Sequence, residues 1–226
     1  MTVIVTGASR GLGASIAERL VSKGIDVFGI ARNADSLPYE AASCDVSSYE
    51  AVKSIAQHLK KSKREVTGVI NAAGIASMNL ALTTTEASTQ KILQTNLAGT
   101  IYCCQHFAPL MIRQKTGTII NFSTIAVAIG LKGESIYAAS KAGVEGFSRS
   151  FAREVADFGL RVNCIAPGPI DTDLLNGVSS EQIQHIVSQQ VIAKQHEKGD
   201  VCDLCEILLD PRSRSLSGQV LHVGGV

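Results

Sequence analysis

The chain has 226 residues, 45% of them hydrophobic, which is enough apolar material for the core of one α/β domain. Its 21 basic and 20 acidic side chains give a net charge of +1, so no general positive field would attract nucleic acid. Charged or glycine-rich stretches interrupt every apolar run before the roughly 20 residues that a membrane helix needs, so we expect no membrane partner. The sequence begins with a strand pattern and no export signal, and we expect a cytoplasmic protein.

Short β-branched runs alternate along the chain with longer helical patterns, which predicts a parallel sheet. The predicted strands cover residues 3–5, 27–30, 66–70, 119–122, 161–165 and 219–223. The predicted helices cover residues 14–21, 49–59, 89–111, 135–158 and 198–209. Because the strands lack polar alternation, helices should cover both faces of the sheet, with right-handed crossovers. We therefore predict an α/β fold with one domain over residues 1–226, a doubly wound parallel sheet of about seven strands.

The least regular stretch lies near the C-terminus. In it, Ile183, Ile186, Val187 and Val191 share one helical face. That face suits a substrate lid around residues 173–197, lying over the mouth of the sheet. An ordinary surface helix with one buried side would give the same pattern, so both interpretations stay open.

The six cysteines lie mostly in apolar segments, and a chain of this length does not need disulfides to hold together. Cys202 and Cys205 form a single C-x-x-C pair. No second pair or nearby histidine completes a zinc tetrad, and redox pairs usually follow a strand. We predict packed, reduced thiols and no metal site.

A glycine-rich turn, residues 6–13, follows the first strand directly and opens the first helix. In this context Gly7 and Gly11 would allow tight turning and close approach of the backbone to a pyrophosphate. The free N–H groups and the dipole of the helix favour the negative charge. Gly13 would let the helix and the strand pack closely. The turn predicts a dinucleotide site.

The end of the second predicted strand bears on which dinucleotide is bound. An acidic residue there would receive the ribose 2′-hydroxyl, but the sequence continues with Arg32 and Asn33. Arg32, together with Arg10 in the glycine turn, could hold a 2′-phosphate, because a guanidinium pairs bidentately with phosphate oxygens. This favours NADP(H) over NAD(H). The alternative is that both arginines are solvated surface residues.

Tyr137 and Lys141 are four residues apart near the start of a predicted helix, so their side chains share one face. A free tyrosine has a pKa of about 10, and a neighbouring ammonium favours the phenolate. The pair is therefore suited to proton exchange with a carbonyl or alcohol oxygen while a nicotinamide exchanges hydride.

Five motifs in this order resemble those of the short-chain dehydrogenases/reductases, which have a Rossmann fold. They are residues 6–13, residues 71–74, Asn96, Tyr137-x-x-x-Lys141 and residues 167–172. The resemblance covers essentially the whole chain. It implies an NADP(H)-dependent oxidoreductase, with Tyr137 as the proton donor and Lys141 also holding the ribose hydroxyls.

The resemblance and the glycine turn together define a candidate site. The expected catalytic residues are Asn96, Thr124, Tyr137 and Lys141. The expected cofactor residues are Gly7, Ser9, Arg10, Gly11, Leu12, Gly13, Arg32, Asp45, Val46, Asn71, Ala73, Gly74, Tyr137, Lys141, Pro167, Gly168, Ile170 and Thr172.

Two of the catalytic positions carry specific expectations. Asn96 should lie in a local distortion of its helix, holding a water that links Lys141 to solvent. The serine that usually orients the substrate is replaced by Thr124, whose methyl group narrows the pocket, and Ser123 is the alternative.

The pattern is most similar to the 3-oxoacyl-acyl-carrier-protein reductases of fatty acid biosynthesis. That similarity implies reduction of a β-ketoacyl thioester, which acyl carrier protein could present, and a homotetramer or homodimer. Of the two basic positions that help to dock the carrier, one is Lys115 here and the other is Phe158. Two alternatives remain. The protein could act on another ketone or secondary alcohol, or it could be a catalytically weak sensor or scaffold that binds NADP.

Overall fold

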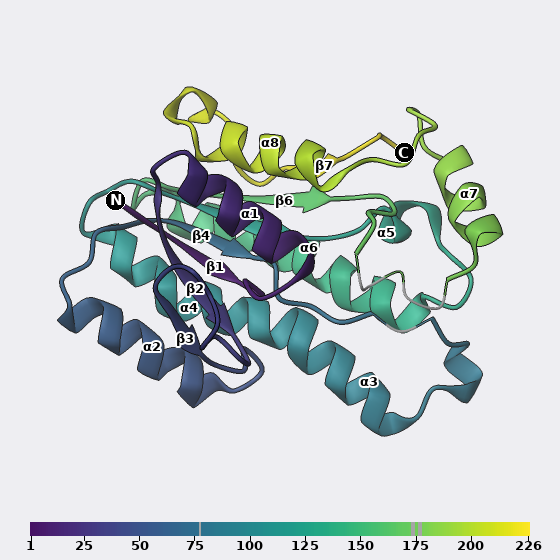
Figure 1. Cartoon of the computed structure of the whole chain (residues 1–226), viewed down its shortest axis with the longest axis horizontal. Coiled ribbons are helices and arrows are strands. Elements are labelled where there is room, and N and C mark those ends of the chain that lie inside the picture. The colour runs from purple at the N-terminus through teal and green to yellow at the C-terminus, as the bar shows by residue number, and fades with distance from the viewer. Residues whose placement is uncertain (77, 173–174, 176–177) are drawn as a thin grey trace.

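The structure is a computed structural model that describes residues 1–76, 78–172, 175 and 178–226. In this part of the chain, seven strands form one parallel sheet in the order β3-β2-β1-β4-β5-β6-β7 (Figure 1). The strands are β1 (Thr2–Thr6), β2 (Asp26–Ala31), β3 (Ala41–Ser43), β4 (Val66–Asn71), β5 (Gly117–Phe122), β6 (Leu160–Ala166) and β7 (Val220–His222). The predicted doubly wound parallel sheet is confirmed.

Helices cover both faces of this sheet (Figure 1). On one face lie α1 (Gly11–Ser22) and α8 (Lys198–Leu209). On the other lie α2 (Tyr49–Lys61), α4 (Gly99–Ile112) and α6 (Ser135–Ala156). Each layer buries its own apolar cluster against the central strands, which explains why those strands are apolar on both sides.

All six predicted strands are present, with ends shifted by no more than two residues. The seventh, β3, was not among them, because it is short and lacks β-branched residues. It is extended because it pairs with the edge of β2, where Gly29 lies opposite Ala41.

The predicted helix over residues 89–111 is interrupted. It consists of α3 (Glu86–Leu93), a π-helical turn η2 (Gln94–Ala98) and α4. Asn96 lies within the π turn, so the expected local distortion at this residue is confirmed. The smaller elements are η1 (Ala81–Thr83), α5 (Ala126–Ile129), α7 (Ser180–Ser188) and η4 (Pro211–Ser213).

The segment of the predicted lid contains α7, which begins with a capping box between Ser179 and Gln182. Ile186 and Val187 are buried, as the helical pattern predicts. Val191 lies beyond the helix and is 76% exposed, so its assignment to the same face was wrong. Positions 173–174 and 176–177 of the predicted lid lie outside the described residues.

All six thiols are free and buried. Cys202 and Cys205 belong to the apolar cluster between the sheet and its α1–α8 layer, and burial raises the pKa of both thiols. The C-x-x-C pair is therefore part of the core. Over the described residues, none of the helices has the length and apolar character needed to cross a bilayer.

Candidate active site

A cavity of about 590 Å³ lies at the C-terminal ends of the central strands. Its walls come from the segments that follow β1, β2, β3, β4, β5 and β6, together with α3, the π turn η2, α6 and α7. Open α/β sheets bind ligands at this edge, and the volume lies within the range of small-molecule and cofactor sites.

The glycine turn forms one end of the cavity. Gly7 has a φ of +70°, and a Cβ added to it would lie 2.9 Å from the Cα of Ala73. A Cβ on Gly13 would lie 2.3 Å from the carbonyl oxygen of Gly7. Both positions therefore exclude a side chain, and Gly13 does allow the close approach of helix and strand that we expected.

Helix α1 begins in this turn without a side-chain cap. In the part of the chain that the structure describes, its N-cap residue Arg10 makes no capping hydrogen bond, and its first turn has no acidic residue. Gly11, Leu12 and Gly13 of the first turn line the cavity, and the first N–H groups of a helix have no carbonyl partner within the helix. They are thus available to an anionic ligand.

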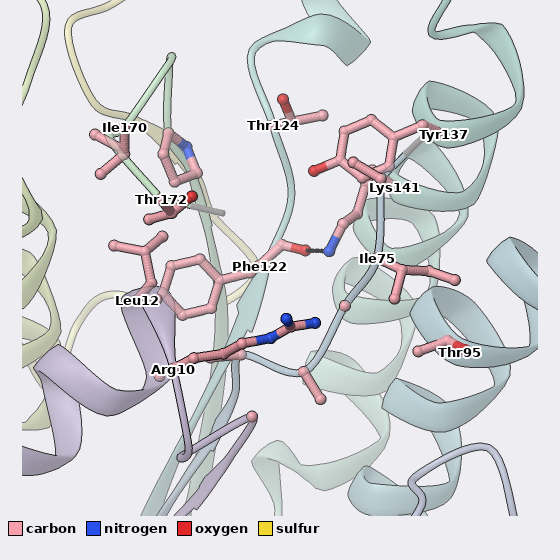
Figure 2. Close-up of a pocket in the computed structure, with 18 of the residues that line it drawn as sticks. Arg10, Leu12, Ile75, Thr95, Phe122, Thr124, Tyr137, Lys141, Ile170 and Thr172 are labelled. Atoms are coloured by element: carbon pink, nitrogen blue, oxygen red, sulfur yellow. Dashed lines mark hydrogen bonds between the residues drawn. The ribbon is translucent and has the colours of Figure 1, made fainter. Parts of the chain in front are cut away.

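Basic side chains gather at the end of the cavity beside β2. Arg32 lies there, as predicted, with Asp45 after β3 and Lys91 on α3. Hydrogen bonds from Ser47 lower the pKa of Asp45, and the positive charges of Arg32 and Lys91 act in the same direction. Arg10 projects over the middle of the cavity (Figure 2).

Tyr137 and Lys141 line the opposite end, on the first turns of α6 (Figure 2). The Lys141 Nζ donates a hydrogen bond of 2.9 Å to the carbonyl oxygen of Phe122 and lies 5.9 Å from the centre of the Tyr137 ring. An ammonium has three N–H donors, so two remain for a ligand. The shared face that the four-residue spacing predicts is confirmed.

The pKa of Tyr137 differs from the sequence-based expectation. Burial raises it well above its usual value, the nearby charge of Glu134 raises it further, and hydrogen bonding to Thr124 opposes the rise. Burial also lowers the pKa of Lys141 to about 8. In the protein by itself, desolvation therefore outweighs the ammonium, and the phenol stays protonated.

The structure separates the two candidate hydroxyls before α5. Ser123 also lines the cavity, but it is buried and its hydroxyl donates a hydrogen bond of 2.6 Å to the Oε1 of Glu145. Thr124 faces the phenol of Tyr137 across the cavity (Figure 2). Of the two, Thr124 has the position for contact with a substrate oxygen.

Asn96 does not line the cavity, although it supports the wall. Its Nδ2 donates to the carbonyl oxygen of Ile75, and its Oδ1 accepts from the N–H of Ile75, both at 2.8 Å. A second bond from Nδ2, of 3.1 Å, reaches the Oγ of Ser140, one residue before Lys141. The π turn thus fixes the strand end after β4 against α6.

Asn71 corrects the expected cofactor site. Its side chain is buried, and its Nδ2 donates a hydrogen bond of 2.8 Å to the Oδ1 of Asn121. The Nδ2 of Asn121 in turn donates a hydrogen bond of 2.8 Å to the Oγ of Ser148. This chain ties β4 to β5 and α6, so Asn71 is a core residue and does not face the cavity. The other expected cofactor residues all line it.

Sequence reasoning missed a group of residues that complete the cavity walls. They include Ile75, Ala76, Lys91, Gln94, Thr95, Ile125, Leu131 and Glu134. Leu175 and Ile186, which also line the cavity, fall within the predicted lid. Glu134 lies one turn before Tyr137, a spacing that could have indicated it. The others carry no local signal, because their distance in sequence from a motif does not show whether their side chains point into the cavity.

A nucleotide-binding turn at one end of the cavity and a Tyr–Lys pair at the other define an oxidoreductase that uses a nicotinamide cofactor. The sequence profile of the family described as "Enoyl-(Acyl carrier protein) reductase" matches residues 7–225. The chain belongs to the short-chain dehydrogenase/reductase family.

Named relatives agree with this assignment. The chain is 33% identical to a 3-oxoacyl-[acyl-carrier-protein] reductase FabG of Staphylococcus aureus, over 99% of this chain and 96% of that protein. It is 32% identical to the Salmonella typhimurium protein of the same name, over 98% and 95% of the two chains.

Solved structures share the fold over almost the entire chain. Thermoplasma acidophilum aldohexose dehydrogenase has a TM-score of 0.89 and 30% identity, over 99% of this chain and 92% of that one. A 4-hydroxyisoleucine dehydrogenase mutant with NADH and succinate has a TM-score of 0.91 and 23% identity, over 100% and 98%, which shows the fold alone.

Proposed function

We propose that the protein is an NADPH-dependent carbonyl reductase that reduces a 3-oxoacyl thioester to the 3-hydroxyacyl product. The observation that carries the proposal is the convergence of Thr124, Tyr137 and Lys141 on one end of a cavity whose other end is a nucleotide-binding turn. A carbonyl oxygen between the two hydroxyls would meet both a hydrogen-bond donor and a proton source.

The residues present fit a dinucleotide with a 2′-phosphate. The uncapped N-terminus of α1 and the glycines that exclude a Cβ suit a pyrophosphate. Arg32 and Lys91 supply positive charge beside β2, where no carboxylate stands at the strand end. Lys141 has donors left for ribose hydroxyls. When bound, NADPH supplies the hydride for the carbonyl carbon.

In the proposed reduction, Tyr137 gives its proton to the carbonyl oxygen as hydride reaches the carbon. The raised pKa of Tyr137 keeps the phenol protonated, which is the form that reduction needs. Oxidation would need the phenolate instead, so burial of this group favours the reductive direction. Thr124 orients the substrate oxygen.

Two observations support the proposed substrate class: the apolar residues that line the cavity and the names of the relatives. Ile75, Ile125, Leu131 and Ile186 give the catalytic end an apolar wall that suits an acyl chain. The 32–33% identical relatives are named for 3-oxoacyl groups on acyl carrier protein. We therefore propose that this protein reduces the same class of substrate in the cytoplasm, as a step of fatty acid biosynthesis. Phe158, 44% exposed, replaces one of the basic docking positions, so free thioesters should also be accepted.

The test is the reduction of a short β-ketoacyl thioester, measured as the loss of NADPH absorbance. Tyr137→Phe should lower kcat/KM by roughly 10²–10⁴-fold, the usual contribution of a general acid, while NADPH binding measured by fluorescence stays within about threefold. Tyr49→Phe, which removes a hydroxyl from the exposed side of α2, is the matched control and should keep full activity. Normal turnover by Tyr137→Phe would reject the assignment of the proton donor.

A further inference from the structure

Glu134 is an acidic residue in the cavity wall with no partner in the part of the chain that the structure describes. It is the N-cap residue of α6, yet its side chain makes no capping hydrogen bond. It is half-buried and lines the cavity. Among the described residues, neither a hydrogen bond nor an ion pair holds its carboxylate, whereas Glu145, further along the same helix, binds both Ser123 and Arg149.

Apolar residues line the cavity together with Glu134. Leu131 and Ile125 share this end of the cavity wall with Tyr137. Burial raises the pKa of Glu134, and no positive group offsets that effect. Its charge in turn raises the pKa of Tyr137, so the carboxylate lies within electrostatic reach of the proton donor.

This placement has an energetic consequence for a ligand. A partly desolvated carboxylate without a partner gains most from a hydrogen-bond donor or a cation, because little water remains to satisfy it. A second carboxylate at the same place would add repulsion between like charges. A substrate that brings a hydrogen-bond donor to this carboxylate would therefore gain affinity, and one that brings a second carboxylate would lose it.

We propose that Glu134 is a specificity residue, which accepts a hydrogen bond from a hydroxyl or ammonium group near the reacting carbonyl of the substrate and disfavours a carboxylate there. The inference rests on the proposed carbonyl reduction at Tyr137. It narrows the 3-oxoacyl substrates proposed above to those that also carry a hydroxyl or ammonium group on the side of the carbonyl that faces the start of α6.

The test uses four ketones of equal chain length. They differ in one group near the carbonyl, which is a methyl, a hydroxyl, an ammonium or a carboxylate. For each protein we compare kcat/KM ratios relative to the methyl ketone. Glu134→Gln should lower the ammonium ratio by about tenfold or more and raise the carboxylate ratio by a similar factor, since a hydrogen bond to a charged group has about this value. Ratios unchanged within twofold would overturn the proposal.

Glu154→Gln is the matched control, because it makes the same charge change at the far, exposed end of α6 and should leave the ratios as they are. Glu134→Ala provides a second variant should the amide fold poorly, and it should lose the hydroxyl preference as well. Equal effects of Glu134→Gln and Glu154→Gln would mean that net charge, and not a contact, sets the preference, which also overturns the proposal.

Ligand binding separates this inference from the proposed function. In the Tyr137→Phe background, the four ketones can be titrated into the complex with NADPH by cofactor fluorescence, without turnover. Tighter binding of the ammonium ketone that disappears with Glu134→Gln supports the role of Glu134 even if the native protein reduces none of the four. Equal binding of all four ketones overturns it even if reduction is fast.

Discussion

At the scale of single residues, burial sets the chemistry of the Tyr137–Lys141 pair. The spacing of the two residues predicts an acidified phenol, but the structure gives the opposite direction for the pKa of Tyr137. Desolvation disfavours the charged form of both groups, and the ammonium, itself hydrogen-bonded to Phe122, does not compensate. A protonated phenol is the form that the proposed reduction needs.

The lowered pKa of Lys141 predicts a pH dependence. The ammonium is present below its pKa of about 8 and is lost as the pH rises through that value. Because the positive charge and its donors serve the ribose and the phenol in our proposal, kcat/KM for reduction should fall above about pH 8. A pH profile from 6 to 10 checks this. A profile that stays flat to pH 10 would contradict it, and Lys141→Met should lack the descending limb.

In our proposal, Arg32 gives the preference for the phosphorylated cofactor. Arg32→Ala should weaken NADPH binding about tenfold or more and NADH binding little, since only NADPH has the 2′-phosphate that a guanidinium holds. Lys91→Ala should also weaken NADPH binding more than NADH binding, but by a smaller factor. Fluorescence titrations with both cofactors measure the ratio. Equal losses for NADPH and NADH would reject this role, and Arg153→Ala, on the exposed end of α6, is the control.

At the scale of elements, two local irregularities position the site. The π turn η2 directs Asn96 at the backbone of Ile75, so the strand end after β4 is held against α6. The glycine turn lets α1 start so close to β1 that its first turn lines the cavity. Each departs from regular structure where a ligand would bind.

Gly13→Ala tests the tight junction of β1 and α1. The new Cβ would lie 2.3 Å from the carbonyl oxygen of Gly7, and the turn would have to move. We expect a loss of about 1–3 kcal/mol in the free energy of unfolding and weaker NADPH binding. Gly146→Ala is the matched control, because a Cβ on this helical glycine meets nothing within 4 Å. It should be neutral or stabilising by up to about 1 kcal/mol. Urea titrations measure both, and equal stability of the two variants would contradict the prediction.

At the scale of the whole molecule, six strand ends far apart in sequence build one cavity. The parallel sheet brings all of its carboxyl ends to the same edge, where the segments after β1, β2, β3, β4, β5 and β6 meet. Catalytic and cofactor groups separated by more than a hundred residues therefore line a single space.

Assembly is the prediction that belongs to this scale. Following the family resemblance, we expect a homotetramer built on the long helices and the C-terminal strand, with a homodimer as the alternative. Light scattering after size exclusion should give four times the mass of one chain. A monomer at micromolar concentration would contradict the prediction.

Much of the fold and of the candidate site follows from the sequence alone. Strand periodicity, the glycine turn and the Tyr137-x-x-x-Lys141 spacing are local, and local patterns survive whatever the rest of the chain does. The order of these motifs is sufficient to predict the sheet, the edge where ligands bind and the family.

The tertiary structure alone decided which side chains face the cavity and which protonation states burial favours. Asn71 turns into the core, Ser123 is held by Glu145, and Glu134 lines the cavity near Tyr137 with no partner among the residues that the structure describes. The short strand β3 likewise exists because β2 offers it an edge. Burial and pairing depend on contacts between segments distant in the chain, and spacing within one segment does not encode those contacts.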